Sequence, residues 1–218
     1  MVTFVSYDDD LTNLQVMYPK QLIEDNLSAI ISQNGLKQFK ISETTKYAHV
    51  TYFLNGGIEQ PYKGEDRFLI ETLKCKTFDE TPAMRAKEIT ETAIINILTK
   101  KYNFMALNYS NCDMLGHTGN LQATIDAVKV IDESVQQLVD AITSIGGIAI
   151  ITADHGNAEH MIDNKGRVLT DHTTNLVPFC VVGAGDLSLA KNGSLCHIAP
   201  TILQLLGIDY PMEKSLIL

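Results

Sequence analysis

The chain has 218 residues, of which 45% are hydrophobic and 20% are charged, and its formal net charge at pH 7 is −9. A chain of this length and composition can bury a core without disulfide bonds and is too apolar to be disordered, so we expect a single domain over residues 1–218. The negative charge argues against nucleic acid or an anionic membrane as a partner, because both bind to a basic face.

In chain order, hydrophobic periodicity predicts a series of alternating strands and helices. They are a strand at Thr3–Ser6, a helix at Gln21–Ser32, a strand at Phe39–Ser42, a run at Tyr47–Leu54 that fits either type, a polar loop between Gly56 and Asp66, a helix from Thr81 to about Lys101, a strand at Phe104–Tyr109, a helix at Thr118–Ser144, strands at Gly147–Ala153 and Phe179–Val182, and a helix at Ile198–Leu206. This alternation favours an α/β fold with a largely parallel sheet flanked by helices.

Three further predictions concern burial or the start of a helix. The continuous apolar run Gly147–Ala153 is typical of a strand buried on both faces. The Thr81-Pro82 pair predicts a helix start, because threonine caps free N–H groups and proline is tolerated in the first turn. His49 lies in an apolar run and is expected to be packed there.

No segment has the features of a membrane span or a secretory signal. The longest apolar stretches are far shorter than the roughly 20 residues that cross a bilayer, and the first residues include neither a basic region nor a long apolar one.

The four cysteines form no Cys-x-x-Cys pair, and this predicts free thiols in the cytoplasm, with Cys180 buried as a small apolar residue.

Acidic and imidazole side chains follow the two strands at 104–109 and 147–153, and another such segment precedes the strand at Phe179. Ligands of open parallel sheets gather outside the carboxyl ends of the strands. We therefore expect one edge of the sheet to bring together Asp113, His117, Asp154, His155 and His172.

Carboxylate and imidazole ligands without thiolates suit Mn²⁺, Zn²⁺ or Fe²⁺. Five ligands exceed the usual set for one ion, so two neighbouring metals are plausible, a device that recurs in phosphoryl transfer. The simpler alternatives are that a strand-terminal aspartate caps a turn, that an isolated histidine is a packed or solvated residue, and that Lys46 is a surface lysine.

Five motifs spread over nearly the whole chain have a more specific meaning. They are KYAHVTYFLNGG at 46–57, GEDR at 64–67, NYSNCDMLGHTG at 108–119, TADHGNAE at 152–159 and HTTN at 172–175. Together, and in this order, they resemble the C-terminal portion of the cofactor-independent (2,3-bisphosphoglycerate-independent) phosphoglycerate mutases, members of the alkaline phosphatase superfamily.

The resemblance implies a three-layer alkaline-phosphatase-like fold and a glycolytic enzyme that interconverts 3-phosphoglycerate and 2-phosphoglycerate through a phosphoserine intermediate. It implies two ions, usually manganese. By motif, Asp113, His117 and His172 resemble the ligands of one metal, and Asp154 and His155 resemble ligands of the other. Lys46 resembles the family's active-site lysine, which would bind substrate and stabilise the phosphoryl oxygens.

The chain also departs from the family pattern. The N-terminal strands with the nucleophilic serine and a further metal-binding aspartate, and the inserted substrate domain, have no counterpart, and no serine stands in a matching strand-to-helix position. We therefore expect a part of the enzyme that is inactive alone, with phosphoglycerate and the N-terminal segment as partners and an exposed sheet edge through which copies can associate. The alternatives are a non-catalytic metal-binding or interaction module, and a metal-dependent phosphatase of the same superfamily.

Overall fold

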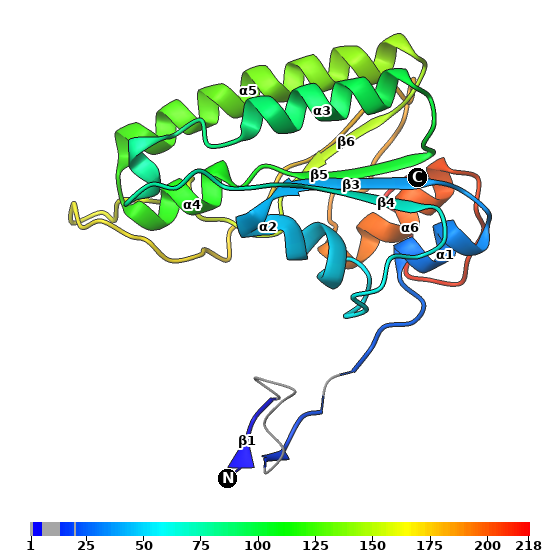
Figure 1. Cartoon of the computed structure of the whole chain (residues 1–218), viewed down its shortest axis with the longest axis horizontal. Coiled ribbons are helices and arrows are strands. Elements are labelled where there is room, and N and C mark those ends of the chain that lie inside the picture. Colours follow the sequence, from blue (N-terminus) through cyan, green and yellow to red (C-terminus); the bar gives the residue numbers. More distant parts are fainter. Residues whose placement is uncertain (1, 6–13, 20) are drawn as a thin grey trace.

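The computed structural model describes residues 2–5, 14–19 and 21–218, and its main body consists of three layers. The middle layer is a parallel sheet of β3 (Gln38–Glu43), β4 (Glu65–Ile70) and β5 (Phe104–Asn108), in the order β4-β3-β5. Figure 1 shows α3 (Ala86–Leu98) and α5 (Leu121–Ser144) on one face of this sheet. The opposite face carries α1 (Leu27–Gln33), α2 (Thr44–Ala48) and α6 (Ile198–Leu205).

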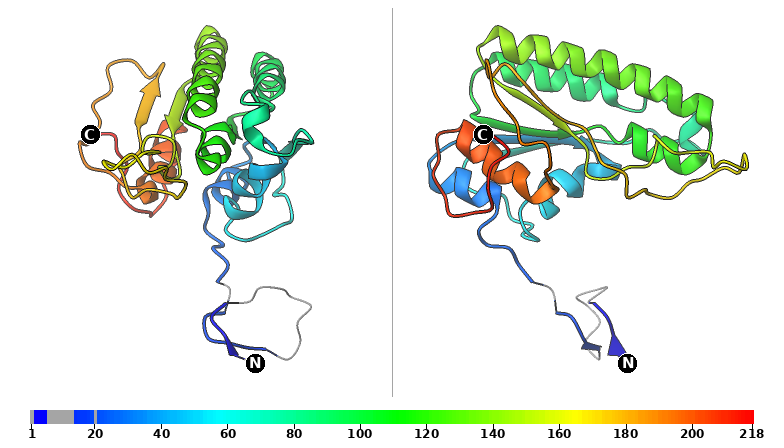
Figure 2. Two further views of the ribbon diagram at one scale, coloured as in Figure 1. Left: turned by 90° about the vertical axis from the view of Figure 1, so that its left-hand side faces the viewer. Right: turned by 180° about the vertical axis from the view of Figure 1, so that it is seen from behind.

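The remaining elements connect or extend these layers. A π-helical turn (His49–Phe53) continues α2, and short 3₁₀ turns lie at Phe78–Glu80 and Leu195–His197. The short helix α4 (Asn111–Thr118) follows β5 directly. Two further pairs of strands lie outside the parallel sheet: β1 (Val2–Thr3) with β2 (Gln15–Val16), which are parallel, and β6 (Ala149–Thr152) with β7 (Phe179–Val182), which are antiparallel. Figure 2 shows the second pair beside the C-terminal half of α5.

The predicted α/β class is confirmed, and so are the strands over 39–42, 104–108 and 179–182 and the last helix. Of the strand predicted at Thr3–Ser6, only Thr3 is in a strand; Phe4 and Val5 form a bend, and Ser6 lies outside the described residues. The ambiguous run at Tyr47–Leu54 is helical. Strand β4 was not predicted, because its charged residues give it no apolar alternation.

Three predictions about helix starts or strand burial are wrong. The helix expected from Gln21 begins only at Leu27, after Asn26 accepts a hydrogen bond from the Ala29 N–H as its N-cap. The helix expected from Thr81 begins at Ala86, because residues 82–85 form turns. Strand β6 is half-exposed rather than buried on both faces, since within the described residues it pairs only with β7.

Cys180 on β7 is exposed, contrary to the prediction that it is buried, although all four cysteines are free thiols as expected. The described helices include none whose length and apolar character would let it span a bilayer.

The core packs in three groups around the sheet. Between α1 and α6 it contains Leu27, Ile30, Ile31 and Leu203. Between the sheet and α3 it contains Phe39, Ile41 and Ile89. Under α4 and the start of α5 it contains Met84, Leu115, Ala123 and Ala127, which hold α4 in place.

A fully buried lysine lies between β3, β4 and α1. The Lys40 amine donates to Ser28 Oγ at 2.7 Å, contacts Asn55 Oδ1 and lies 3.4 Å from Glu65 Oε1. Arg67 binds the same Glu65 oxygen at 2.5 Å. Two of the motifs, NGG and GEDR, therefore contribute to a buried polar network. Burial lowers the pKa of the Lys40 amine to about 8, although the charge of Glu65 opposes this shift.

This lowered pKa predicts a rise in stability at alkaline pH. Below pH 8 the amine is protonated in both the folded and unfolded states; between pH 8 and its ordinary value of 10.5, the unfolded chain binds more protons, so folding becomes more favourable as pH rises. From pH 8 to 9.5 the free energy of unfolding should rise by about 1.5 kcal/mol more in the wild type than in Lys40→Met. Urea unfolding at each pH measures this, with the exposed Lys87→Met as the charge-matched control. Equal rises in wild type and Lys40→Met would contradict the prediction.

Candidate metal centre

The site is built where β3 and β5 end. These neighbouring strands run in register from Gln38 opposite Phe104 to Ser42 opposite Asn108, so the helices that follow them, α2 and α4, start side by side. A 2.8 Å hydrogen bond between the hydroxyl groups of Thr45 and Ser110 ties their first turns together. Lys46 on α2 and Asp113 in the first turn of α4 consequently face the same space.

Asp113 is the centre of this site. Its Oδ2 accepts a 2.8 Å contact from the buried Lys46 amine, and its Oδ1 lies 3.0 Å from His172 Nε2 and 3.2 Å from His117 Nε2. Burial alone would raise the pKa of this carboxyl group, but the hydrogen bond and charge of Lys46, together with the neighbouring histidines, lower it. Asp113 is therefore held as a carboxylate.

His117 presents a free ring nitrogen to the same point. It lies one turn after Asp113 on α4, and its Nδ1 is 2.6 Å from the backbone oxygen of Thr170. Because that oxygen only accepts hydrogen bonds, Nδ1 carries a proton, and in the neutral imidazole Nε2 then offers its lone pair to a metal ion. This Nε2 lies 3.0 Å from His172 Nε2, so two ring nitrogens and a carboxylate oxygen converge.

This arrangement fits a divalent cation. The ligand atoms of Asp113, His117 and His172 all lie within 4.8 Å of one another. A histidine whose second nitrogen donates to a carbonyl is the usual setting of a metal-ligating imidazole, because that bond fixes the tautomer and the ring orientation. The donor set of one carboxylate and two imidazoles matches the chemistry of Mn²⁺, Zn²⁺ or Fe²⁺.

Asp154 and His155, which follow β6, adjoin this group. The His155 ring stacks on His172 with their centroids 3.7 Å apart, and its Nε2 lies 3.8 Å from Asp113 Oδ1. Asp154 lies on the open side, with its Oδ2 at 3.6 Å from the same His155 nitrogen and 45% of its side chain exposed. The structure therefore brings together all five predicted ligands and Lys46.

Several residues near the site were missed or misjudged. His49 is exposed on the turn after α2 rather than packed in a core, and its ring lies 5.2 Å from Phe53. Ser110 stands between a strand and a helix, but it is fully buried and its hydroxyl group is paired with Thr45. It is therefore no nucleophile. The motif residues Asn157, Glu159 and Thr173, to which the sequence assigned no role, form hydrogen bonds around the ligands.

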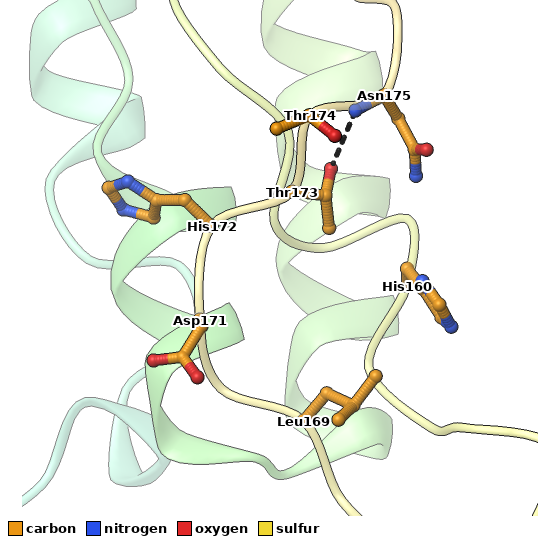
Figure 3. A pocket seen from close by; sticks show the side chains of 7 residues that line it. All are labelled: His160, Leu169, Asp171, His172, Thr173, Thr174 and Asn175. Carbon is orange, nitrogen blue, oxygen red and sulfur yellow. Dashed lines mark hydrogen bonds between the residues drawn. The ribbon is translucent and has the colours of Figure 1, made fainter.

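A pocket of about 380 Å³ lies beside His172. Figure 3 shows its lining along the 169–175 segment, with the His172 and His160 rings pointing in opposite directions. Its polar lining, which includes Asp171 and Asn175, leaves space for a small polar molecule next to the candidate metal ligands.

Comparisons with known proteins give related sequences and a related structure. Residues 8–210 match the sequence profile of the Metalloenzyme superfamily. A 2,3-bisphosphoglycerate-independent phosphoglycerate mutase from Synechococcus elongatus is 48% identical over 223 residues, covering 98% of this chain and 42% of that relative. Phosphoglycerate mutase 1 of Methanosarcina acetivorans is 46% identical over 215 residues, with the same coverage of 98% and 42%.

A solved structure is similar over the whole chain. The phosphoglycerate mutase of Leishmania mexicana, crystallised at low cobalt concentration, superposes with a TM-score of 0.88 and 34% sequence identity, covering 100% of this chain and 44% of that one. The resemblance to phosphoglycerate mutases and the predicted fold class are thereby confirmed. The chain spans less than half the length of these relatives.

Proposed function

This chain belongs to the Metalloenzyme superfamily, and we propose that residues 1–218 form the C-terminal, metal-binding part of a phosphatase-like domain in a phosphoglycerate mutase. The proposed reaction interconverts 3-phosphoglycerate and 2-phosphoglycerate in glycolysis. The observation that carries this proposal is the convergence of Asp113, His117 and His172 on one point beside the Lys46 amine.

The proposed ligands divide into two sets. Asp113, His117 and His172 would hold one ion, and Asp154 and His155 would contribute to a second, for which manganese is the metal that the family resemblance implies. Two bound divalent ions would neutralise charge on the transferring phosphoryl group. The chain's own contribution is to fix the ligands: the Thr170 carbonyl orients His117, and the first turn of α4 presents Asp113 to the same point.

Lys46 is the residue that we propose to act directly on substrate. Its amine is buried and held at 2.8 Å from Asp113, so its charge is already oriented before substrate binds. A fixed cation in a site of low dielectric stabilises developing negative charge more strongly than a solvated one. We propose that it contacts the phosphoryl oxygens of phosphoglycerate.

The serine that accepts the phosphoryl group is proposed to come from the part of the relatives that this chain does not match. Strand β4 is at the edge of the parallel sheet and exposes Phe68 and Leu69. Such an edge can pair with another strand, so we propose it as the place where that part, or a second copy, docks. The four free thiols fit the reducing cytoplasm, where we propose that the enzyme works.

Reconstitution tests this function. The chain would be mixed with the segment of the Synechococcus elongatus mutase that it does not match, in the presence of Mn²⁺, and conversion of 3-phosphoglycerate would be followed by a coupled assay. We expect activity only in the mixture, because neither polypeptide would have both the serine and the metal ligands Asp113, His117 and His172.

The controls separate the alternative functions. The Synechococcus elongatus segment should remain inactive both alone and when it is mixed with the Asp113→Asn variant of this chain. A folded complex without activity would contradict the proposal and favour a non-catalytic module. Phosphate release from a generic monoester by the chain alone, abolished in Asp154→Ala, would instead indicate a metal-dependent phosphatase.

A further inference from the structure

The loop after β6 and the segment before β7 carry one stacked histidine each, His155 and His172. These two stretches are joined next to the rings by a single antiparallel bridge, in which the Thr173 N–H donates to the Gly156 carbonyl at 2.9 Å. Since both stretches are irregular loops, further contacts are needed to keep the centroids of the two imidazole rings 3.7 Å apart.

The Glu159 carboxylate makes those contacts. It accepts hydrogen bonds from the Asn157 N–H at 2.6 Å, from the Thr173 hydroxyl group, and from the Asn175 side-chain amide at 2.9 Å. Asn157 belongs to the His155 loop, whereas Thr173 and Asn175 belong to the His172 segment. One carboxylate therefore binds both segments through donors alone.

The packing around this carboxylate is close. A methyl group on Gly156 would overlap both Thr173 Oγ1 and Glu159 Oε1, so only glycine fits between the bridge and the carboxylate. A methyl group on Gly116 of α4 would likewise overlap the Asn157 side chain, whose amide nitrogen is 3.4 Å from Asp113 Oδ1. The same network thus reaches a third candidate ligand.

Glu159 is suited to this role rather than to ligation. Burial would raise the pKa of its carboxyl group, but the hydrogen bonds from Thr173, Asn175 and the backbone lower it to about 2. Its two oxygens are already occupied by donors, which leaves the imidazoles and Asp113 as the free ligands.

We infer that Glu159, acting through Thr173 and Asn175, is a positioning residue that sets the distance between His155 and His172 and so the affinity of the metal centre. This inference rests on the proposed function, since it takes these histidines to be metal ligands. Residues that orient metal ligands typically change metal affinity by about 10- to 100-fold when they are replaced.

The test measures Mn²⁺ binding to the 218-residue chain by isothermal titration calorimetry. Thr173→Val keeps the shape of the side chain but loses the donor, and we expect its affinity to fall about tenfold or more. Glu159→Gln should weaken binding similarly, because its amide places a donor against donors. Thr173→Ser keeps the hydroxyl group and should bind within about threefold of the wild type. Thr174→Val, a neighbouring substitution outside the network, is the matched control.

A second measurement distinguishes a failure of this inference from a failure of the proposed function. Without metal, hydrogen exchange at the Thr173 amide should be faster in Thr173→Val than in Thr173→Ser, because the bridge to Gly156 loses its support. If the wild type binds Mn²⁺ and Thr173→Val and Glu159→Gln bind it equally well, the positioning role is wrong. If the wild type binds no Mn²⁺, the proposed function fails. If hydrogen exchange at the residue 173 amide is the same in Thr173→Val as in Thr173→Ser, the Thr173 hydroxyl group does not hold the two segments together.

Discussion

Replacing Asp113 by asparagine should weaken Mn²⁺ binding by at least roughly 100-fold, because a direct ligand costs more than the residues that orient it. Asp113 contacts Lys46, His117 and His172 at 2.8–3.2 Å and is the only carboxylate in the three-residue ligand group among the described residues. Asparagine keeps the shape but removes the charge, and its amide nitrogen would face ring nitrogens or an ammonium group. Calorimetric titration with Mn²⁺ gives the affinity directly.

The control for this variant is Asp126→Asn. Asp126 is exposed on α5 and paired with Lys129, so the substitution removes the same charge far from the ligands. Co²⁺, the metal named for the Leishmania mexicana structure, provides an independent absorption signal. Wild-type Mn²⁺ affinity in a folded Asp113→Asn chain would show that the convergence of these side chains is not a metal site.

Replacing Lys46 by methionine should lower the turnover of the reconstituted enzyme by about 10²- to 10³-fold, the usual cost of removing one oriented group that stabilises transition-state charge. Mn²⁺ binding should not weaken, because the substitution removes a cation 2.8 Å from Asp113 and leaves the ligands in place. The two measurements together separate a substrate-binding role from a structural one.

Lys87→Met, which removes an exposed lysine from α3, controls for the loss of one positive charge. A parallel loss of turnover and of Mn²⁺ affinity in Lys46→Met would contradict the proposed role, since it would mean that Lys46 acts by supporting Asp113.

Four of the candidate ligands could be predicted from the sequence because they follow strands, whereas His172 precedes one. The strand over 104–108 is apolar enough to be recognised, and the carboxyl ends of parallel neighbours meet at one edge. The short helix α4, which places Asp113 and His117 one turn apart, was not predicted. The motif resemblance then assigned Lys46, which composition alone treats as a surface residue.

Other features depend on contacts that no local pattern contains. Strand β4 carries the charged residue Glu65, which is buried because Lys40 and Asn55 meet it from other parts of the chain, and Arg67, which pairs with the same carboxylate. The apolar run of β6 predicts burial on both faces, yet the strand is half-exposed because burial depends on which neighbours cover it.

The sequence by itself determined the α/β class, most of the strands of the main body, and the set of side chains able to hold a metal, since each follows from periodicity, motif or residue chemistry. Only the tertiary structure decided how those side chains are oriented: the Thr170 carbonyl behind His117, and the Glu159 carboxylate between the two histidine segments. These partners are 53 residues apart in the first case and 14 and 16 in the second. A hydrogen bond depends on distance and angle in space, which sequence separation does not specify.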